Sequence, residues 1–165
     1  MKFLKKNYYK FYLIIFVIFI SLIYLYSSQI LKEKDKTKNL EPIVLNLFTN
    51  VHPNLPWSFK AIKKKLSITP GEVTAVEYMV TNLDDKATTG IATFAYFPKQ
   101  YGSYISKLNC FCFDAQTLKA NEEAKYTLVL LIDPEVTKDS KTKKVKEVTI
   151  QFTFFDYKEY KKNKS

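Results

Sequence analysis

Near its N-terminus the chain contains an uncharged run, residues 11–31, that limits what the protein can fold into. Leu, Ile, Phe, Val and Tyr dominate this run. At a rise of 1.5 Å per residue, a helix of this length crosses a hydrocarbon core of about 30 Å. The sequence therefore predicts one transmembrane helix that contacts membrane lipid.

Lysines flank the predicted helix on both sides and bear on its orientation. Residues 1–10 contain lysine and no acid, whereas Glu33 and Asp35 dilute the lysines that follow the run. Because basic residues favour the cytoplasmic side, we expect a cytoplasmic N-terminus, a single-pass helix in a bacterial inner membrane and a periplasmic C-terminal domain. A cleaved signal peptide is the alternative, but the run is longer than a usual h-region and no Ala-x-Ala-like site follows it. An uncleaved signal-anchor is preferred.

The chain after the helix is long enough for one domain. Residues 32–41 alternate in charge without an apolar face, so we expect a flexible or weakly helical linker. Residues 42–157 form the candidate domain. Residues 158–165 are polar and rich in lysine, which predicts a disordered basic tail.

The basic residues number 26, and every one is lysine, with a net charge of +10. Residues 42–157 contribute only +2 of it, so the excess lies at the two ends of the chain. The bidentate guanidinium groups that read phosphates or guanine are missing, which argues against a nucleic-acid partner. With one histidine and no marked pair of carboxylates, hydrolytic catalysis is also disfavoured, and we expect no enzyme.

Beyond residue 42 the chain consists of short segments with a period of two, separated by turn signals. Val76, Tyr78 and Val80 alternate with polar residues, and Val148, Ile150, Phe152 and Phe154 repeat the pattern, as do Tyr126, Leu128, Leu130 and Ile132. The expected strands are residues 43–49, 66–69, 74–81, 91–97, 108–113, 126–132 and 148–154. Their number and spacing predict an all-β, immunoglobulin-like β-sandwich.

The only two cysteines, Cys110 and Cys112, lie one residue apart within residues 108–113. An extended backbone would place both sulfurs on one face and Phe111 on the other. Thiolates favour Cu(I), Zn(II) or iron–sulfur units, and structural zinc takes four ligands, which one chain with one histidine does not supply. Cu(I) is therefore the preferred metal. The alternative is that both cysteines are ordinary buried residues.

Three other side chains are candidates for roles at this pair. His52 and Met79 could each supply a further metal ligand, although a surface histidine and a packed methionine are the more common interpretations. Lys107 could favour the thiolate form by its charge, or be a plain solvated lysine. Outside the cytoplasm neighbouring thiols tend to oxidise, so a Cys110–Cys112 disulfide that a reductant must open is a further hypothesis.

Several short motifs occur in a fixed order along the soluble part of the chain. They are Leu55-Pro56-Trp57-Ser58-Phe59, Pro70-Gly71-Glu72, Thr81-Asn82-Leu83, Gly90-Ile91-Ala92-Thr93, Tyr104-Ile105-Ser106-Lys107-Leu108-Asn109-Cys110-Phe111-Cys112-Phe113, Gln116 with Leu118, Asp133-Pro134-Glu135 and Thr153-Phe154-Phe155. In these motifs the sequence resembles the CtaG family of cytochrome c oxidase assembly proteins, which are membrane-anchored copper chaperones. The resemblance covers about residues 46–157 and the N-terminal span.

This resemblance implies a periplasmic or intermembrane-space domain that hands Cu(I) to the copper B centre of cytochrome c oxidase subunit I. It implies that Cys110 and Cys112 are the copper ligands. It also implies a homodimer with metal at the contact, since two chains supply four sulfurs. Many members carry another cysteine between the span and the domain, whereas the linker 32–41 occupies that place here.

Two other functions share these residues. A thiol–disulfide exchange protein would use the same cysteine pair without a metal. A plain membrane-tethered binding module would use the cysteines only for packing. Measured copper uptake would distinguish a copper chaperone from both of these alternatives.

Overall fold

The computed structural model describes residues 2–38 and 40–162. The chain divides after residue 39 into two units, a long N-terminal helix and a β-domain. Each unit is described here by itself.

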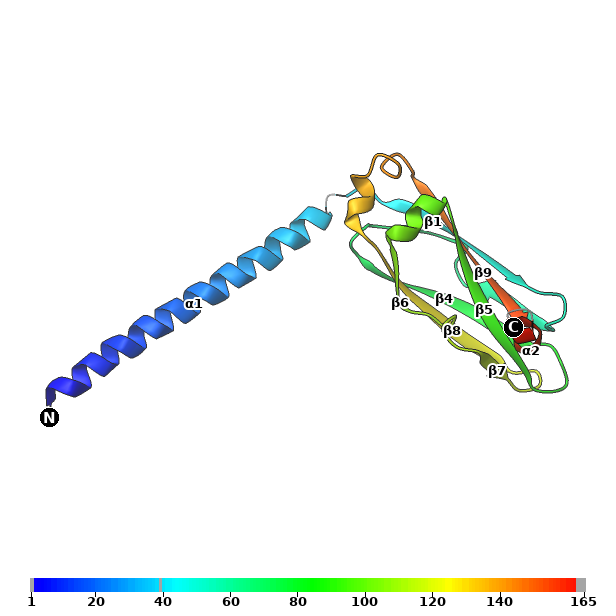
Figure 1. Ribbon diagram of the computed structural model, residues 1–165, viewed down its shortest axis with the longest axis horizontal. Coiled ribbons are helices and arrows are strands. Elements are labelled where there is room, and N and C mark those ends of the chain that lie inside the picture. The colour runs from blue at the N-terminus through cyan, green and yellow to red at the C-terminus, as the bar shows by residue number, and fades with distance from the viewer. Residues whose placement is uncertain (1, 39, 163–165) are drawn as a thin grey trace. The chain divides into compact units, whose positions relative to one another are not determined.

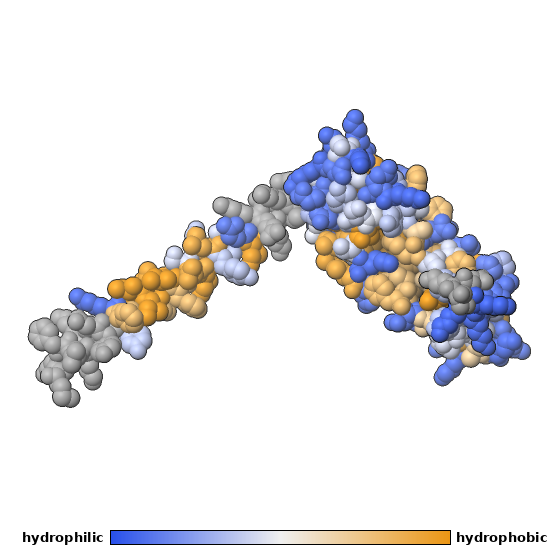
Figure 2. All heavy atoms as spheres, viewed as in Figure 1, coloured by the Kyte–Doolittle hydropathy of each residue, from blue (hydrophilic) through white to orange (hydrophobic). Residues whose placement is uncertain are grey.

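The N-terminal unit is the single helix α1 (Lys2–Lys38), drawn in blue in Figure 1. Within it the segment Lys10–Ile30 is long and apolar enough to cross a membrane, and none of it is buried against protein. Figure 2 shows the hydrophobic side chains along this segment. The predicted apolar N-terminal helix is thus confirmed, and it is a candidate membrane anchor.

The linker expected over residues 32–41 is mostly helical, because α1 continues as far as Lys38. Leu, Lys and Glu are good helix formers, and no glycine or proline interrupts the chain before Pro42. A charged sequence without an apolar face can therefore extend a helix that the apolar run has already nucleated.

The described part of the domain contains nine strands, two short 3₁₀-helices and one short α-helix. The strands are β1 (Ile43–Val51), β2 (Trp57–Ala61), β3 (Lys65–Ile68), β4 (Val73–Asn82), β5 (Thr88–Phe97), β6 (Ile105–Asn109), β7 (Gln116–Leu118), β8 (Glu123–Ile132) and β9 (Glu147–Asp156), and the helices are η1 (Lys99–Ser103), η2 (Pro134–Thr137) and α2 (Tyr157–Lys162).

The strands form two sheets that face each other, as Figure 1 shows. One sheet has five strands in the order β3-β1-β9-β5-β7, and the other has four in the order β2-β4-β8-β6. All neighbours pair antiparallel except β1 and β9, which run parallel from Val44 opposite Glu147 to Val51 opposite Phe154. The predicted β-sandwich is confirmed, and its assignment to the immunoglobulin-like class stays a prediction.

The core lies between the sheets and follows the period-two pattern of the sequence. The inward residues of β4, β8 and β9 are buried as predicted, with Tyr126 only partly covered. Trp57 is also a core residue, since its indole packs on Phe154 with ring centres 5.0 Å apart and its Nε1–H donates to Thr88 Oγ1 at 2.7 Å. Gly90 leaves room for the indole, because a Cβ there would come within 2.9 Å of the ring.

Three expectations about individual elements were wrong. Strands β2 and β7 were not predicted. β7 has only three residues, too few to display a period, whereas in β2 the alternation of the buried Trp57 and Phe59 with Ser58 and Lys60 was present in the sequence but not interpreted as a strand. The segment 108–113 is not a strand, since β6 ends at Asn109. Part of the tail expected to be disordered over residues 158–165 belongs to helix α2, whereas residues 163–165 lie outside the described residues.

Candidate metal centre

Residues 110–115, called here the cysteine turn, connect the two sheets. β6 is the edge strand of the four-stranded sheet and β7 is the edge strand of the five-stranded sheet. A bulge between Lys107 and Asn109 shifts the register of β6 against β8, and the pairing ends one residue later, with Asn109 opposite Val129. The chain must leave one sheet here to reach the other, which is why the cysteines lie in a turn and not on an extended strand.

The two cysteines face each other within this turn and are joined by a disulfide bond. Their Cα atoms are 5.1 Å apart. The backbone N–H of Cys112 donates to Cys110 Sγ at 3.2 Å, and the N–H of Phe113 donates to the carbonyl oxygen of Cys110 at 3.2 Å. The turn therefore brings both sulfurs to one point through its own hydrogen bonds.

The two sulfurs differ in exposure. Cys110 is buried, with 4% of its surface exposed, whereas Cys112 is partly exposed. Leu108 and Phe113 on either side of the pair are 54% and 56% exposed. A reagent or an ion can thus approach the pair from the Cys112 side, past two apolar side chains.

Phe111 fixes the turn to the core of the domain. Its ring is 7% exposed and lies between the two sheets. Its ring centre is 4.8 to 6.0 Å from those of Phe59, Tyr78, Tyr126, Phe152 and Phe154. Cys110 is buried in the same core cluster as Phe111, and Cys112 is only partly buried beside it, so the expectation that both sulfurs lie on the face opposite Phe111 stays a prediction.

Lys107 places a positive charge beside the cysteine pair. Its Nζ lies 3.8 Å from Cys112 Sγ, 4.4 Å from the ring centre of Phe94 and 5.5 Å from that of Phe113. Burial among these groups lowers the pKa of Lys107 from its ordinary value. The side chain suggested by sequence as a neighbour of the thiols is therefore in contact with one of them.

Two polar side chains hold the turn and the strand that follows it. Gln116 Nε2 donates to the carbonyl oxygens of Phe111 at 3.1 Å and of Asp114 at 3.2 Å. The buried Asn82 donates from Nδ2 to the carbonyls of Lys86, Leu118 and Lys119 at 2.8 to 3.2 Å. Both residues belong to motifs of the sequence, but no pattern in the chain indicated these roles.

The structure does not bring His52 and Met79 to the cysteine pair. His52 follows β1, and its ring packs on Phe155 with centres 5.5 Å apart. Met79 lies on β4 between the inward residues Tyr78 and Val80, so it belongs to the outer face of its sheet. Within residues 2–38 and 40–162 there is no group of three His, Cys, Asp or Glu side chains that could hold a metal. One domain therefore offers two sulfur ligands.

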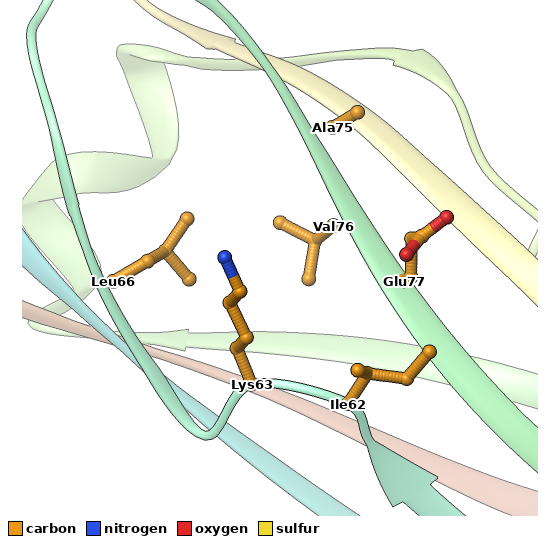
Figure 3. A pocket seen from close by; sticks show the side chains of 6 residues that line it. All are labelled: Ile62, Lys63, Leu66, Ala75, Val76 and Glu77. Carbon is orange, nitrogen blue, oxygen red and sulfur yellow. The ribbon is translucent and has the colours of Figure 1, made fainter.

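A pocket of about 160 Å³ lies at the other edge of the sandwich, where Ile62 and Lys63 of the β2–β3 connection face β4. Figure 3 shows the Lys63 ammonium between Leu66 and Val76. Because β2 and β3 form the edges opposite β6 and β7, this pocket is separate from the cysteine turn. Its walls are apolar apart from Lys63 and Glu77, and Glu77 pairs with Lys125.

The fold and the site together define a class of protein, a β-sandwich behind a candidate membrane anchor, with a vicinal cysteine pair at a sheet-to-sheet turn. The family model described as "Cytochrome c oxidase assembly protein CtaG/Cox11" matches residues 22–156. The chain belongs to this family, which confirms the resemblance inferred from its motifs.

Curated relatives agree with this assignment. The chain is 38% identical over 115 residues to "Cytochrome c oxidase assembly protein CtaG" of Sinorhizobium fredii, covering 70% of this chain and 58% of the relative. It is 37% identical over 117 residues to the protein of that name from Nitrobacter hamburgensis, covering 71% and 54%. It is 35% identical over 130 residues to human "Cytochrome c oxidase assembly protein COX11, mitochondrial", covering 76% and 47%. The chain thus spans about half the length of these relatives.

Proposed function

We propose that the protein takes part in cytochrome c oxidase assembly as a membrane-anchored copper chaperone. Cys110 and Cys112 bind Cu(I) and deliver it to the copper B site of oxidase subunit I. The protein carries an ion and is not an enzyme. The observation that carries the proposal is the meeting of two sulfur atoms at one turn, beside a lysine and with one sulfur partly open to solvent.

Copper binding requires the reduced pair. A dithiol reductant supplies two electrons and two protons, the bond between the two Sγ atoms breaks, and the reductant becomes a disulfide. Cu(I) then displaces the two thiol protons and is held by two thiolates, ligands that favour this ion. Its oxidation state does not change on binding or on transfer.

The proposal includes a place and a partner. Helix α1 spans the inner membrane with its N-terminus in the cytoplasm, and the β-domain lies in the periplasm. A second copy of the domain brings its own pair of thiolates to the contact, so that a dimer presents four sulfurs to two Cu(I) ions, one for each chain. The exposed Leu108 and Phe113 beside the pair would be covered in such a homodimer.

The test is copper binding by the full chain in detergent, reduced and then titrated with Cu(I) under nitrogen. About one ion should bind per chain, and Cys110→Ala should abolish binding. His52→Asn and Met79→Leu are matched controls that should keep it, because neither side chain belongs to the site. Light scattering before and after loading reports the dimer. Normal copper uptake by the Cys110→Ala protein would contradict the proposal.

The disulfide itself favours a second candidate, thiol–disulfide exchange with another assembly factor. The reduced pair would give two electrons to a disulfide of the partner, the Cys110–Cys112 bond would re-form, and a dithiol reductant would regenerate the pair. Metal-free protein should then turn over a disulfide substrate in the presence of excess dithiol. Copper binding without such turnover would reject this candidate.

A further inference from the structure

A loop outside the cysteine turn concentrates the positive charge of the domain. Residues 138–146, called here the basic loop, connect η2 to β9 and contain a single acid, Asp139. Its five lysines are all exposed, and they are Lys138, Lys141, Lys143, Lys144 and Lys146. Since residues 42–157 together carry only +2, this loop is far more basic than the rest of the domain.

Interior contacts fix the backbone of the basic loop. Thr142 is 1% exposed, and its hydroxyl donates to the carbonyl oxygen of Val136 at 2.6 Å. The hydroxyl of Tyr101 donates to the carbonyl oxygen of Val145 at 3.1 Å, and that of Tyr104 donates to the carboxylate of Asp139 at 2.6 Å. Because these groups face inward, the lysines between them face solvent as an ordered set.

The basic loop lies at the end of the domain where the chain arrives from α1. Glu41 forms an ion pair with Lys146, and the N–H of Val44 donates to the carbonyl oxygen of Lys146 at 2.8 Å. Figure 2, viewed as Figure 1, shows hydrophilic residues covering the end of the domain that carries η1 and η2. A covalent connection thus joins this end of the domain to the candidate membrane span.

Part of this charge is not neutralised by the domain itself. Lys138 pairs with Glu135 and Lys146 with Glu41. Among the residues that the structure describes, Lys143 and Lys144 form no ion pair with a carboxylate. A lysine ammonium is a compact charge that binds phosphate without a fixed orientation, so such a set matches a surface of phosphate groups.

We propose that the basic loop binds the anionic phospholipid head groups of the membrane that α1 spans. Charge complementarity and the position beside the start of β1 favour a lipid surface over a soluble anion. The contact holds this end of the domain against the bilayer. The cysteine turn joins the edge strands β6 and β7, whereas the basic loop leads into the inner strand β9, so the lipid contact leaves the turn free for its own partner.

A second lysine group provides an internal control. Lys60, Lys63 and Lys64 lie on β2 and the β2–β3 connection, at an edge of the sandwich, and are as basic as the central part of the basic loop. They form no ion pair with any carboxylate among the described residues. If charge alone governed lipid contact, both groups would respond alike.

The experiment uses the full chain in nanodiscs of phosphatidylglycerol and phosphatidylcholine, or of phosphatidylcholine alone. A water-soluble acylating reagent modifies lysines, and mass spectrometry gives the rate at each site. Lys138, Lys141, Lys143 and Lys144 should react about fivefold more slowly in the anionic discs, which corresponds to about 1 kcal/mol per lysine. High salt should remove the difference. Lys60, Lys63 and Lys64 should react equally in both discs.

Variants make the test specific to the loop. In Lys141→Gln/Lys143→Gln/Lys144→Gln the remaining Lys138 should lose its protection, whereas Lys60→Gln/Lys63→Gln/Lys64→Gln should keep it. Equal rates at the loop lysines in the two kinds of disc would overturn the proposal. Equal protection of both lysine groups would also overturn it, since that result indicates attraction by charge alone without a defined contact. A chain that does not enter the discs would remove the membrane span on which the proposal depends and would overturn it as well.

Discussion

At the scale of single residues, the cysteine pair and Lys107 form one unit. The sequence places Lys107 three residues before Cys110, a spacing that by itself leaves the direction of the side chain open. In the structure the ammonium group lies 3.8 Å from Cys112 Sγ and over the Phe94 ring. A Cu(I) ion bound by two thiolates carries a net negative charge, so the lysine should stabilise the loaded site.

Replacing Lys107 should therefore weaken copper binding without unfolding the protein. We expect Lys107→Met to lower Cu(I) affinity on the order of tenfold, because one nearby charge is lost while the aliphatic part of the side chain still packs. Competition with a colorimetric Cu(I) chelator measures the affinity.

Lys107→Arg keeps the charge and should bind within about threefold of the natural protein. Lys119→Met removes an exposed lysine after β7 and controls for net charge. An unchanged affinity in Lys107→Met would show that this charge does not act on the bound ion.

At the scale of elements, the cysteine turn is where sequence patterns and structure disagree most. The segment 108–113 alternates as an edge strand does, but β6 ends at Asn109 and the chain crosses to the other sheet. Two phenylalanines of the same turn illustrate this, since Phe111 is buried among five aromatic rings and Phe113 is exposed. Phe111 thus anchors the turn, and Phe113 forms part of its surface.

Truncation of the two rings should have different effects on stability. Phe111→Ala should lower the free energy of unfolding by about 3 to 5 kcal/mol, because it opens a cavity between the sheets. Phe113→Ala should change the free energy of unfolding by less than about 1 kcal/mol, since more than half of the Phe113 side chain is already exposed to solvent and its removal opens no cavity. Urea denaturation with the disulfide intact measures both values. Similar losses in the two variants would mean that Phe111 does not anchor the turn.

At the scale of the whole molecule, the helix and the domain are separate compact units, to which the proposed function gives separate roles. The core consists of β-domain residues alone, and the segment Lys10–Ile30 is not buried against protein. Membrane attachment and copper binding should therefore be separable. Under the proposed function, α1 would concentrate the cysteine pair near the membrane in which the proposed acceptor is assembled.

Removing residues 1–39 should leave a folded and copper-binding domain. We expect a melting temperature within a few degrees of that of the full chain, because the core residues among those that the structure describes begin at Ile43. The full chain should partition into the detergent phase of a cloud-point extraction, and the truncated chain into the aqueous phase. Loss of cooperative melting on truncation would contradict this division.

The sequence by itself determined the apolar helix, the β-sandwich, the inward faces of β4, β8 and β9, and the identity of the cysteine pair. These features follow from local periodicity and from the chemistry of the side chains, both of which are visible in the sequence without the tertiary structure. β7, with three residues, is too short to show such a period.

Only the tertiary structure determined which side chains lie next to one another at the cysteine turn. The turn exists because two sheets must be joined at their edges. Asn82 holds the strand β7 that follows it through the carbonyl oxygen of Leu118, which lies 36 residues further along the chain and comes close only after folding. The same is true of His52 and Met79, whose chemistry suits a metal but which the fold places on Phe155 and on the outer face of β4, away from the cysteines. Proximity between residues distant in sequence is a property of packing, and no local pattern encodes it.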